Sequence, residues 1–92
     1  MNGRQTCEAV DAEYDLMVDF RISPGAAAVS TAHILARSTD PVLAAFAEPA
    51  LEDLGEGDEL EGVVSAEHSQ AAAQHYCVLS YPGTGMLRSP SM

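Results

Sequence analysis

The sequence predicts a two-layer α+β domain, in which two consecutive helices cover one face of a three-stranded antiparallel sheet in the order β-α-α-β-β. Three observations support this fold class. Residues 14–22 alternate apolar and polar side chains, as a half-buried strand does. Residues 25–54 carry apolar side chains at helical spacing, and two later segments, 60–66 and 76–79, again resemble strands.

The length of 92 residues fits one small domain. Residues 1–12 show no sustained period, and residues 82–92 show no pattern, so we expect a flexible N-terminal arm and a flexible C-terminal tail around a domain of residues 13–81. The core should be thin, because the chain has no Trp and few other aromatic residues.

The first expected strand, residues 14–22, has one apolar and one polar face. The apolar face contains Tyr14, Leu16, Val18, Phe20 and Ile22, and the other face contains Asp15, Met17, Asp19 and Arg21. Such a strand lies on a core with its back to solvent. Since its aromatic ring should be buried, truncating Phe20 to Ala should cost about 3 to 5 kcal/mol.

Two helices should follow, over residues 25–37 and 41–54. Ser23 and Asp40 are suited to cap them, and each is followed by a proline at the first helical position. The second helix has an apolar series of Leu43, Phe46, Ala47, Ala50, Leu51 and Leu54. Pro49 interrupts this pattern off the apolar side, which predicts a kink or two short helices, and Gly55 should end the element.

The remaining strands are expected at residues 60–66, weakened by a glycine, and at 76–79, which is apolar on both faces. The segment 67–75 between them is open to two interpretations. Its alanines favour a helical turn, but it is shorter than a parallel crossover. A hairpin turning near residues 69–70 is therefore preferred, with one helical turn as the alternative.

Charge excludes several classes of function. The chain has 14 Asp and Glu, 4 Arg and no Lys, for a formal net charge of −10. Direct binding of nucleic acid or adhesion to an anionic membrane needs clustered positive charge, so neither is expected. A protein partner with a basic surface is favoured, while solubility alone is the competing explanation of the acidity.

The segment from residue 48 to residue 61 is the candidate partner-binding site. Its acidic residues are Glu48, Glu52, Asp53, Glu56, Asp58, Glu59 and Glu61, with no basic residue among them. Carboxylates at the C-terminal end of a helix oppose its dipole, which suggests a role outside folding. Asp15 and Asp19, on the polar face of the first strand, should extend the same negative surface.

The expected compartment is the cytoplasm. No export signal or membrane-spanning run is visible. Cys7 and Cys77 are accordingly expected to be free thiols.

Metal chemistry is the remaining candidate. His68, His75 and Cys77 are the metal-capable side chains that lie closest together, but their spacing does not match the paired ligands of structural zinc sites. No cofactor is expected, and no residue is assigned a catalytic role.

The sequence therefore predicts a small, acidic, non-enzymatic binding or regulatory protein that engages a basic partner surface. An inhibitor that occupies a nucleic-acid-binding site is one form of this function. The alternatives are a small structural subunit of a homo- or hetero-oligomer, a homodimer included, and a minor metal-binding protein that uses His68, His75 and Cys77.

Overall fold

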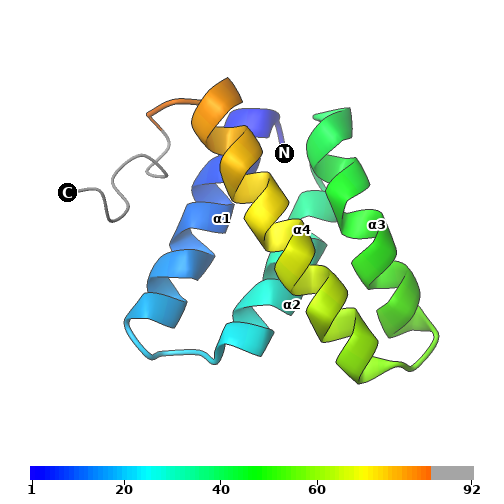
Figure 1. The fold of residues 1–92 in the computed structure, drawn as a ribbon. Helices are drawn as coiled ribbons and strands as arrows, with labels where there is room; N and C mark the ends of the chain where they lie inside the picture. Colours follow the sequence, from blue (N-terminus) through cyan, green and yellow to red (C-terminus); the bar gives the residue numbers. More distant parts are fainter. Residues whose placement is uncertain (84–92) are drawn as a thin grey trace.

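The computed structural model describes residues 1–83 of the chain. These residues form four helices and no strand: α1 (Gly3–Val18), α2 (Pro24–Ala36), α3 (Pro41–Gly55) and α4 (Glu59–Ser80) (Figure 1). The predicted α+β fold is therefore wrong, and residues 1–83 form a single all-helical domain. Most of the expected C-terminal tail, residues 84–92, lies outside the described residues.

Helix α1 joins two segments that the sequence pattern separates. Residues 1–12, expected to form a flexible arm, contain its N-cap and first turns, and residues 14–22, expected to form a strand, contain its end and the turn after it. The Asn2 side chain accepts a hydrogen bond from the backbone N–H of Gln5 at 2.8 Å, and the Gln5 side chain accepts from that of Asn2 at 2.9 Å. This capping box starts the helix. The residues that α1 buries are spaced along one helical side: Gly3, Thr6, Cys7 and Val10.

Phe20 lies outside the core to which the strand pattern assigns it. Its side chain is 95% exposed, and its backbone has a φ of 60°, in the left-handed region. This conformation costs about 1 kcal/mol for a residue with a Cβ atom. Phe20 therefore belongs to the turn between α1 and α2.

The two predicted helices and their caps are confirmed. The Ser23 hydroxyl accepts from the N–H of Ala26 at 3.1 Å, and the Asp40 carboxylate accepts from the N–H of Val42 at 2.9 Å. Pro49 lies exposed within α3, which continues as one helix to Gly55.

Helix α4 replaces the second and third expected strands and the hairpin between them. It runs for 22 residues, and its buried residues follow one another at helical spacings of one, three and four: Gly62, Ala66, Ser69, Gln70, Ala73 and Cys77. These side chains are small or polar. Helix α4 therefore buries a helical face that contains no large apolar residue.

Small residues let α4 approach α3 closely. A Cβ atom at Gly62 would lie 2.4 Å from Cδ2 of Leu54 and 3.3 Å from the Leu54 backbone nitrogen. Farther along α4, the hydroxyl of Ser69 donates a hydrogen bond to the backbone carbonyl of Phe46. These contacts join the two helices along much of their length.

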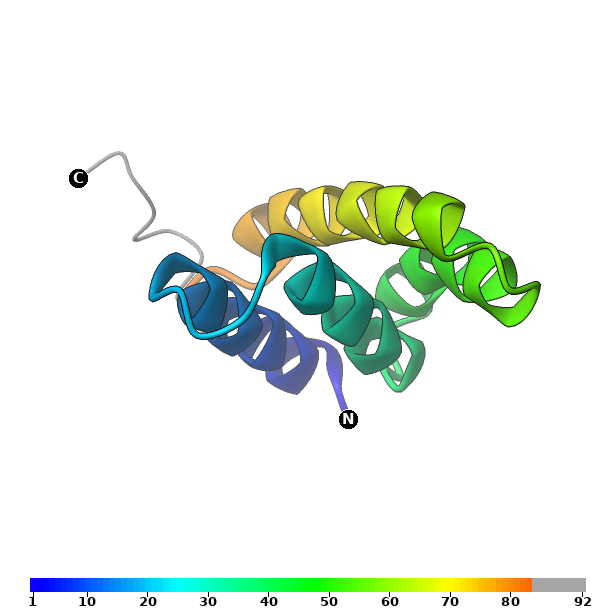
Figure 2. The ribbon, with the colours of Figure 1, turned by 90° about the horizontal axis from the view of Figure 1, so that it is seen from below.

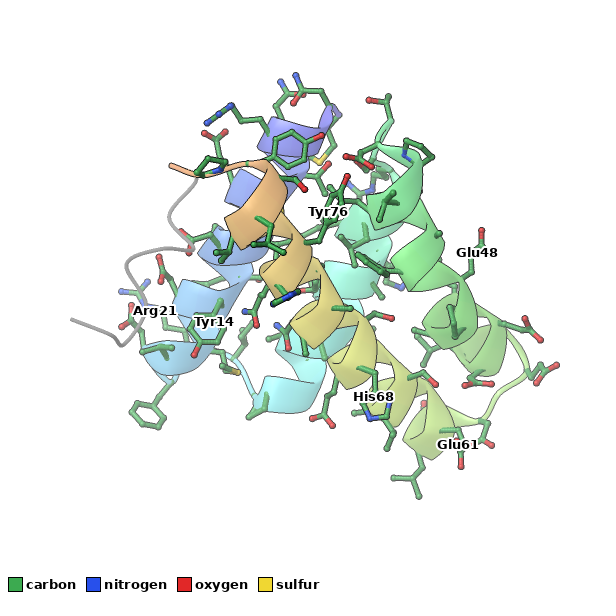
Figure 3. The ribbon with its side chains drawn as sticks, turned by 45° about the horizontal axis from the view of Figure 1, so that its top comes forward. Tyr14, Arg21, Glu48, Glu61, His68 and Tyr76 are labelled. Atoms are coloured by element: carbon green, nitrogen blue, oxygen red, sulfur yellow. A yellow bond between two sulfur atoms is a disulfide. The ribbon has the colours of Figure 1, made fainter. Side chains whose placement is uncertain are left out.

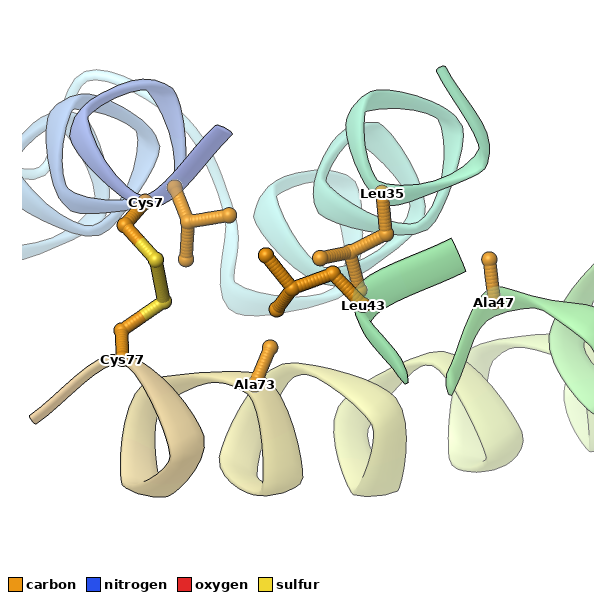
Figure 4. Close-up of a cluster of buried hydrophobic side chains, with 7 residues drawn as sticks. Cys7, Leu35, Leu43, Ala47, Ala73 and Cys77 are labelled. Carbon is orange, nitrogen blue, oxygen red and sulfur yellow. A yellow bond between two sulfur atoms is a disulfide. The ribbon is translucent and has the colours of Figure 1, made fainter. Parts of the chain in front are cut away.

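The main core lies where all four helices meet, and α4 lies across one side of α1, α2 and α3 (Figure 2). Leu35 and Leu43 pack there beside Ala73, next to a disulfide between Cys7 and Cys77 (Figure 4). The expectation of free thiols is thus wrong, because α1 and α4 bring two cysteines that are 70 residues apart in the sequence into bonding distance.

Candidate functional site

The acidic end of the molecule is built from the last turn of α3, the three-residue turn 56–58 and the first turn of α4. We use this name for Glu52, Asp53, Glu56, Asp58, Glu59 and Glu61. All of them are exposed except Asp53, which is partly buried. The structure therefore brings together six of the seven acidic residues of the predicted segment.

Backbone geometry sets the position of this turn. Gly57 has a φ of +84°, which a glycine adopts without strain. The N–H of Gly57 donates to the carbonyl of Leu54 at 3.1 Å, and the N–H of Asp58 donates to that of Asp53 at 3.1 Å. The turn thus closes α3 and sets the direction of α4.

Part of the negative charge has a role in folding. The Asp58 carboxylate accepts from the N–H of Glu61 at 3.1 Å and caps α4. Glu59 and Glu61 lie in the first turn of α4, where carboxylates complement the helix dipole. Asp53 accepts a hydrogen bond from the hydroxyl of Ser65 at 2.7 Å, which joins α3 to α4.

Glu52 and Glu56 are the carboxylates of this surface that the fold does not use. Both are exposed, and within residues 1–83 neither side chain takes part in a hydrogen bond or cap of the kind described above. Glu52 lies in the last turn of α3 and Glu56 is its C-cap, so both oppose the dipole of that helix. These two residues are therefore the best candidates for a role outside folding, and Asp58, Glu59 and Glu61 are weaker ones.

Three predicted partner-binding residues lie away from the acidic end. Glu48 lies farther back on α3 (Figure 3). Asp15 lies in the last turn of α1 and Asp19 is its C-cap, and that end of α1 is on the opposite side of the molecule from the α3–α4 turn (Figure 1). The negative surface is therefore not continuous from the first segment to the second.

The three metal-capable residues are not arranged as a site. Cys77 is bonded to Cys7, and the hairpin that would have paired His68 with His75 does not exist. The two histidines are exposed and lie two turns apart on α4, a rise of about 10 Å. Among the described residues, no group of three His, Cys, Asp or Glu side chains is placed to hold a metal ion.

A second polar cluster lies around Asp40. Its Oδ2 atom accepts hydrogen bonds from the hydroxyls of Tyr76 at 2.9 Å and Tyr81 at 2.6 Å. Tyr76 also makes an edge contact with Phe46, with ring centroids 6.0 Å apart. The cluster fastens the C-terminal end of α4 to the start of α3 (Figure 3).

Protonation in this cluster follows from its hydrogen bonds. Partial burial raises the pKa of Asp40, but the hydrogen bonds from Tyr81, Tyr76 and two backbone N–H groups outweigh it, so the pKa lies below its ordinary value. The pKa values of both phenols are raised, first by the hydrogen bond to Asp40 and then by burial. The cluster is thus a fixed link of one carboxylate and two neutral phenols at neutral pH.

Comparison of the chain with models of known protein families, with curated proteins and with solved structures finds no match. None of the helices in residues 1–83 combines the length and the apolar character needed to cross a bilayer.

Proposed function

We propose that this chain is a small, non-enzymatic binding or regulatory protein whose acidic end engages a protein partner with a basic surface. The observation that supports this most directly is the pair Glu52 and Glu56. Both carboxylates are exposed, both oppose the dipole of α3, and neither accepts a capping hydrogen bond from a helix N-terminus. A negatively charged surface of this kind is complementary to a basic one.

Charge of one sign acts mainly on the rate of encounter. A net charge of −10 attracts a basic partner over about one Debye length, roughly 8 to 10 Å at physiological salt, and repels acidic proteins and nucleic acid. The basic surface of a nucleic-acid-binding site is one partner of this chemistry. Exposed Leu60, in the first turn of α4, adds an apolar contact within the same surface.

The test is affinity capture from the source cell with three baits. These are the wild type, the variant Glu52→Lys/Glu56→Lys, and the control Asp15→Lys/Asp19→Lys, which changes the same charge on the opposite side of the molecule. We expect the acidic-end variant to lose a basic protein that both other baits retain, and we expect salt to weaken that capture. Equal capture by all three baits would refute the proposal.

The second candidate is a structural subunit of an oligomer. Its supporting observation is the exposure of large apolar residues on α4, with Leu60 at 77% and Leu79 at 70%. A subunit that pairs through this helix would cover them. Size-exclusion chromatography with light scattering distinguishes an oligomer from a monomeric binding protein.

The cytoplasmic location stays a prediction, and the Cys7–Cys77 disulfide counts against it. Disulfides persist mainly in oxidising compartments, and the expected location assumed two free thiols. Alkylation of thiols at the moment of lysis, followed by mass spectrometry, distinguishes the cytoplasm from an oxidising compartment. Alkylated Cys7 and Cys77 would show free thiols and support a cytoplasmic location, and an intact disulfide would oppose it.

A further inference from the structure

Helix α1 is buried only in its first half. Its buried residues are Gly3, Thr6, Cys7 and Val10, whereas residues 11–18 are all partly or fully exposed. The helix lies at one edge of the molecule, with α2 between it and α3 (Figure 2). The packing of α1 therefore depends mainly on a short segment around Cys7.

The other three helices, which we call the body, have a core to which α1 does not contribute. A separate buried cluster contains small residues from each of them: Ala28, Ala32, Ala50 and Ala66. Side-chain hydrogen bonds also join them, because the Gln70 amide donates to the Thr31 hydroxyl at 3.5 Å and the Ser65 hydroxyl donates to the Asp53 carboxylate at 2.7 Å. The body thus has contacts of its own that release of α1 would leave in place.

Two covalent connections join α1 to the body: the chain at residues 19–23 and the disulfide between Cys7 and Cys77. The chain connection is a short turn in which Phe20 has a left-handed backbone. A change at a few dihedral angles of such a turn moves the whole helix, so the turn can act as a hinge. The disulfide is the connection that prevents this movement, because it ties the buried half of α1 to the last turn of α4.

We propose that α1 is a redox-controlled cover, which reduction of the Cys7–Cys77 bond releases from the body about the turn at residues 19–23. The reductant is a dithiol. One of its thiolates attacks a sulfur of the Cys7–Cys77 bond and forms a mixed disulfide, and its second thiol then displaces the protein sulfur. The reductant becomes a disulfide and gives up two electrons and two protons, and Cys7 and Cys77 become thiols.

Release of α1 uncovers part of the main core. Cys7 and Val10 pack there in one cluster with Leu35, Leu43 and Ala73 of the body (Figure 4). The acidic end lies at the other end of α4 from the disulfide and belongs to the body, so its turn and its charges stay in place. The redox state thus changes the apolar surface of the protein and leaves its acidic surface as it is.

The contacts that remain after reduction favour the closed state only modestly. They include a hydrogen bond from the Ser30 hydroxyl to the Glu13 carboxylate and the packing of Tyr81 against Gly3. The groups of such a hydrogen bond can bond to water when the helix is released, so its net contribution is small. Release also frees Phe20 from its left-handed conformation. The reduced protein should therefore release α1 more often than it unfolds as a whole.

The first experiment is amide hydrogen exchange of the intact protein, measured by mass spectrometry with the disulfide oxidised and after reduction with dithiothreitol. In the oxidised protein, residues 6–11 of α1 and residues 66–73 of α4 should exchange within about threefold of each other. In the reduced protein, residues 6–11 should exchange at least about tenfold faster than residues 66–73. If both segments of the reduced protein exchange at one rate, fast or slow, α1 does not open separately and the proposal is wrong.

The second experiment compares two matched truncations in the reduced protein. Val29→Ala, in the body beside the separate alanine cluster, should speed exchange of residues 66–73 by about tenfold and leave residues 6–11 unchanged, because Val29 stays packed when α1 is released. Val10→Ala should speed both segments, because it weakens the closed state relative to every open one. If Val29→Ala speeds residues 6–11 as much as residues 66–73, α1 opens only with the whole fold, which would overturn the proposal.

Discussion

Reduction of the Cys7–Cys77 disulfide should destabilise the protein more than any single substitution on its surface. The bond closes a loop of 70 residues that includes α2, α3 and most of α4. Both cysteines are fully buried in the main core. Without the bond, α1 is held by few buried side chains, of which Val10 is the largest.

The magnitude follows from the length of the loop. Closing about 70 residues removes chain entropy worth about 4 kcal/mol at 25 °C in the loop-entropy relation. A domain of this size has a total stability of about 5 to 10 kcal/mol, so reduction should remove roughly half of it. The melting temperature should fall by roughly 15 to 30 °C.

The assay is urea unfolding followed by far-UV circular dichroism, with and without a phosphine reductant. A variant with Cys7→Ala and Cys77→Ala serves as the control, because its midpoint should not respond to the reductant. Thiol titration of the unfolded, unreduced protein should find no free thiol. Two free thiols in protein prepared under oxidising conditions, or midpoints that agree with and without reductant, would refute the reasoning.

The remaining predictions concern single sites, and urea unfolding measures each of them. Gly62→Ala should lower the free energy of unfolding by about 1 to 3 kcal/mol, because the added Cβ would overlap Leu54. The control Gly55→Ala should be neutral or slightly stabilising, because nothing lies within 4 Å of its Cβ. Equal losses of stability in the two variants would contradict this. Phe20→Gly should raise the free energy of unfolding by up to about 1 kcal/mol by relieving the left-handed backbone, while Phe20→Ala should change it little. The pKa of Asp40 is lowered in the folded protein, so the contribution of Asp40 to the free energy of unfolding should be complete above about pH 4 and lost as pH falls through the folded pKa. The difference in stability between the wild type and Asp40→Asn should therefore shrink in acid. For the two phenols that donate to this carboxylate the sign is opposite, so their contribution should be lost as pH rises beyond about 10.

The central helices could be predicted because local chemistry and packing agree there. Ser23 and Asp40 are strong capping residues, each followed by a proline, and they start α2 and α3 where the sequence indicates. Leu43, Ala47 and Ala50 of the predicted apolar series are buried as expected. The caps fix the boundaries, and the apolar spacing fixes the buried face.

Helix α1 could not be predicted because its signal is divided between two kinds of pattern. Its buried residues lie in the first ten positions, where Thr6 and Cys7 do not stand out as apolar. The stronger alternation after Tyr14 falls on its less buried second half and on the turn at Phe20. A period of two over a few residues is compatible with a helix whose last turns are only partly covered.

The site was predictable in its charge and not in its shape. Six acidic residues gather at one end because the turn between two helices brings them together, and this follows from their nearness in sequence. The separation of Asp15 and Asp19 from that end depends on the packing of α1, as does the disulfide, and the link between Asp40 and the two tyrosines depends on the packing of α4 against α3. Contacts between residues 36 to 70 positions apart have no local signal.

The failure to predict α4 and the exposure of Leu60 and Leu79 have one physical cause. Hydrophobic periodicity identifies a helix when its large apolar residues face the core, and α4 buries small residues there instead, at Gly62, Ala66 and Ala73. Small residues allow close contact with α3, but they leave Leu60 and Leu79 without cover inside the fold.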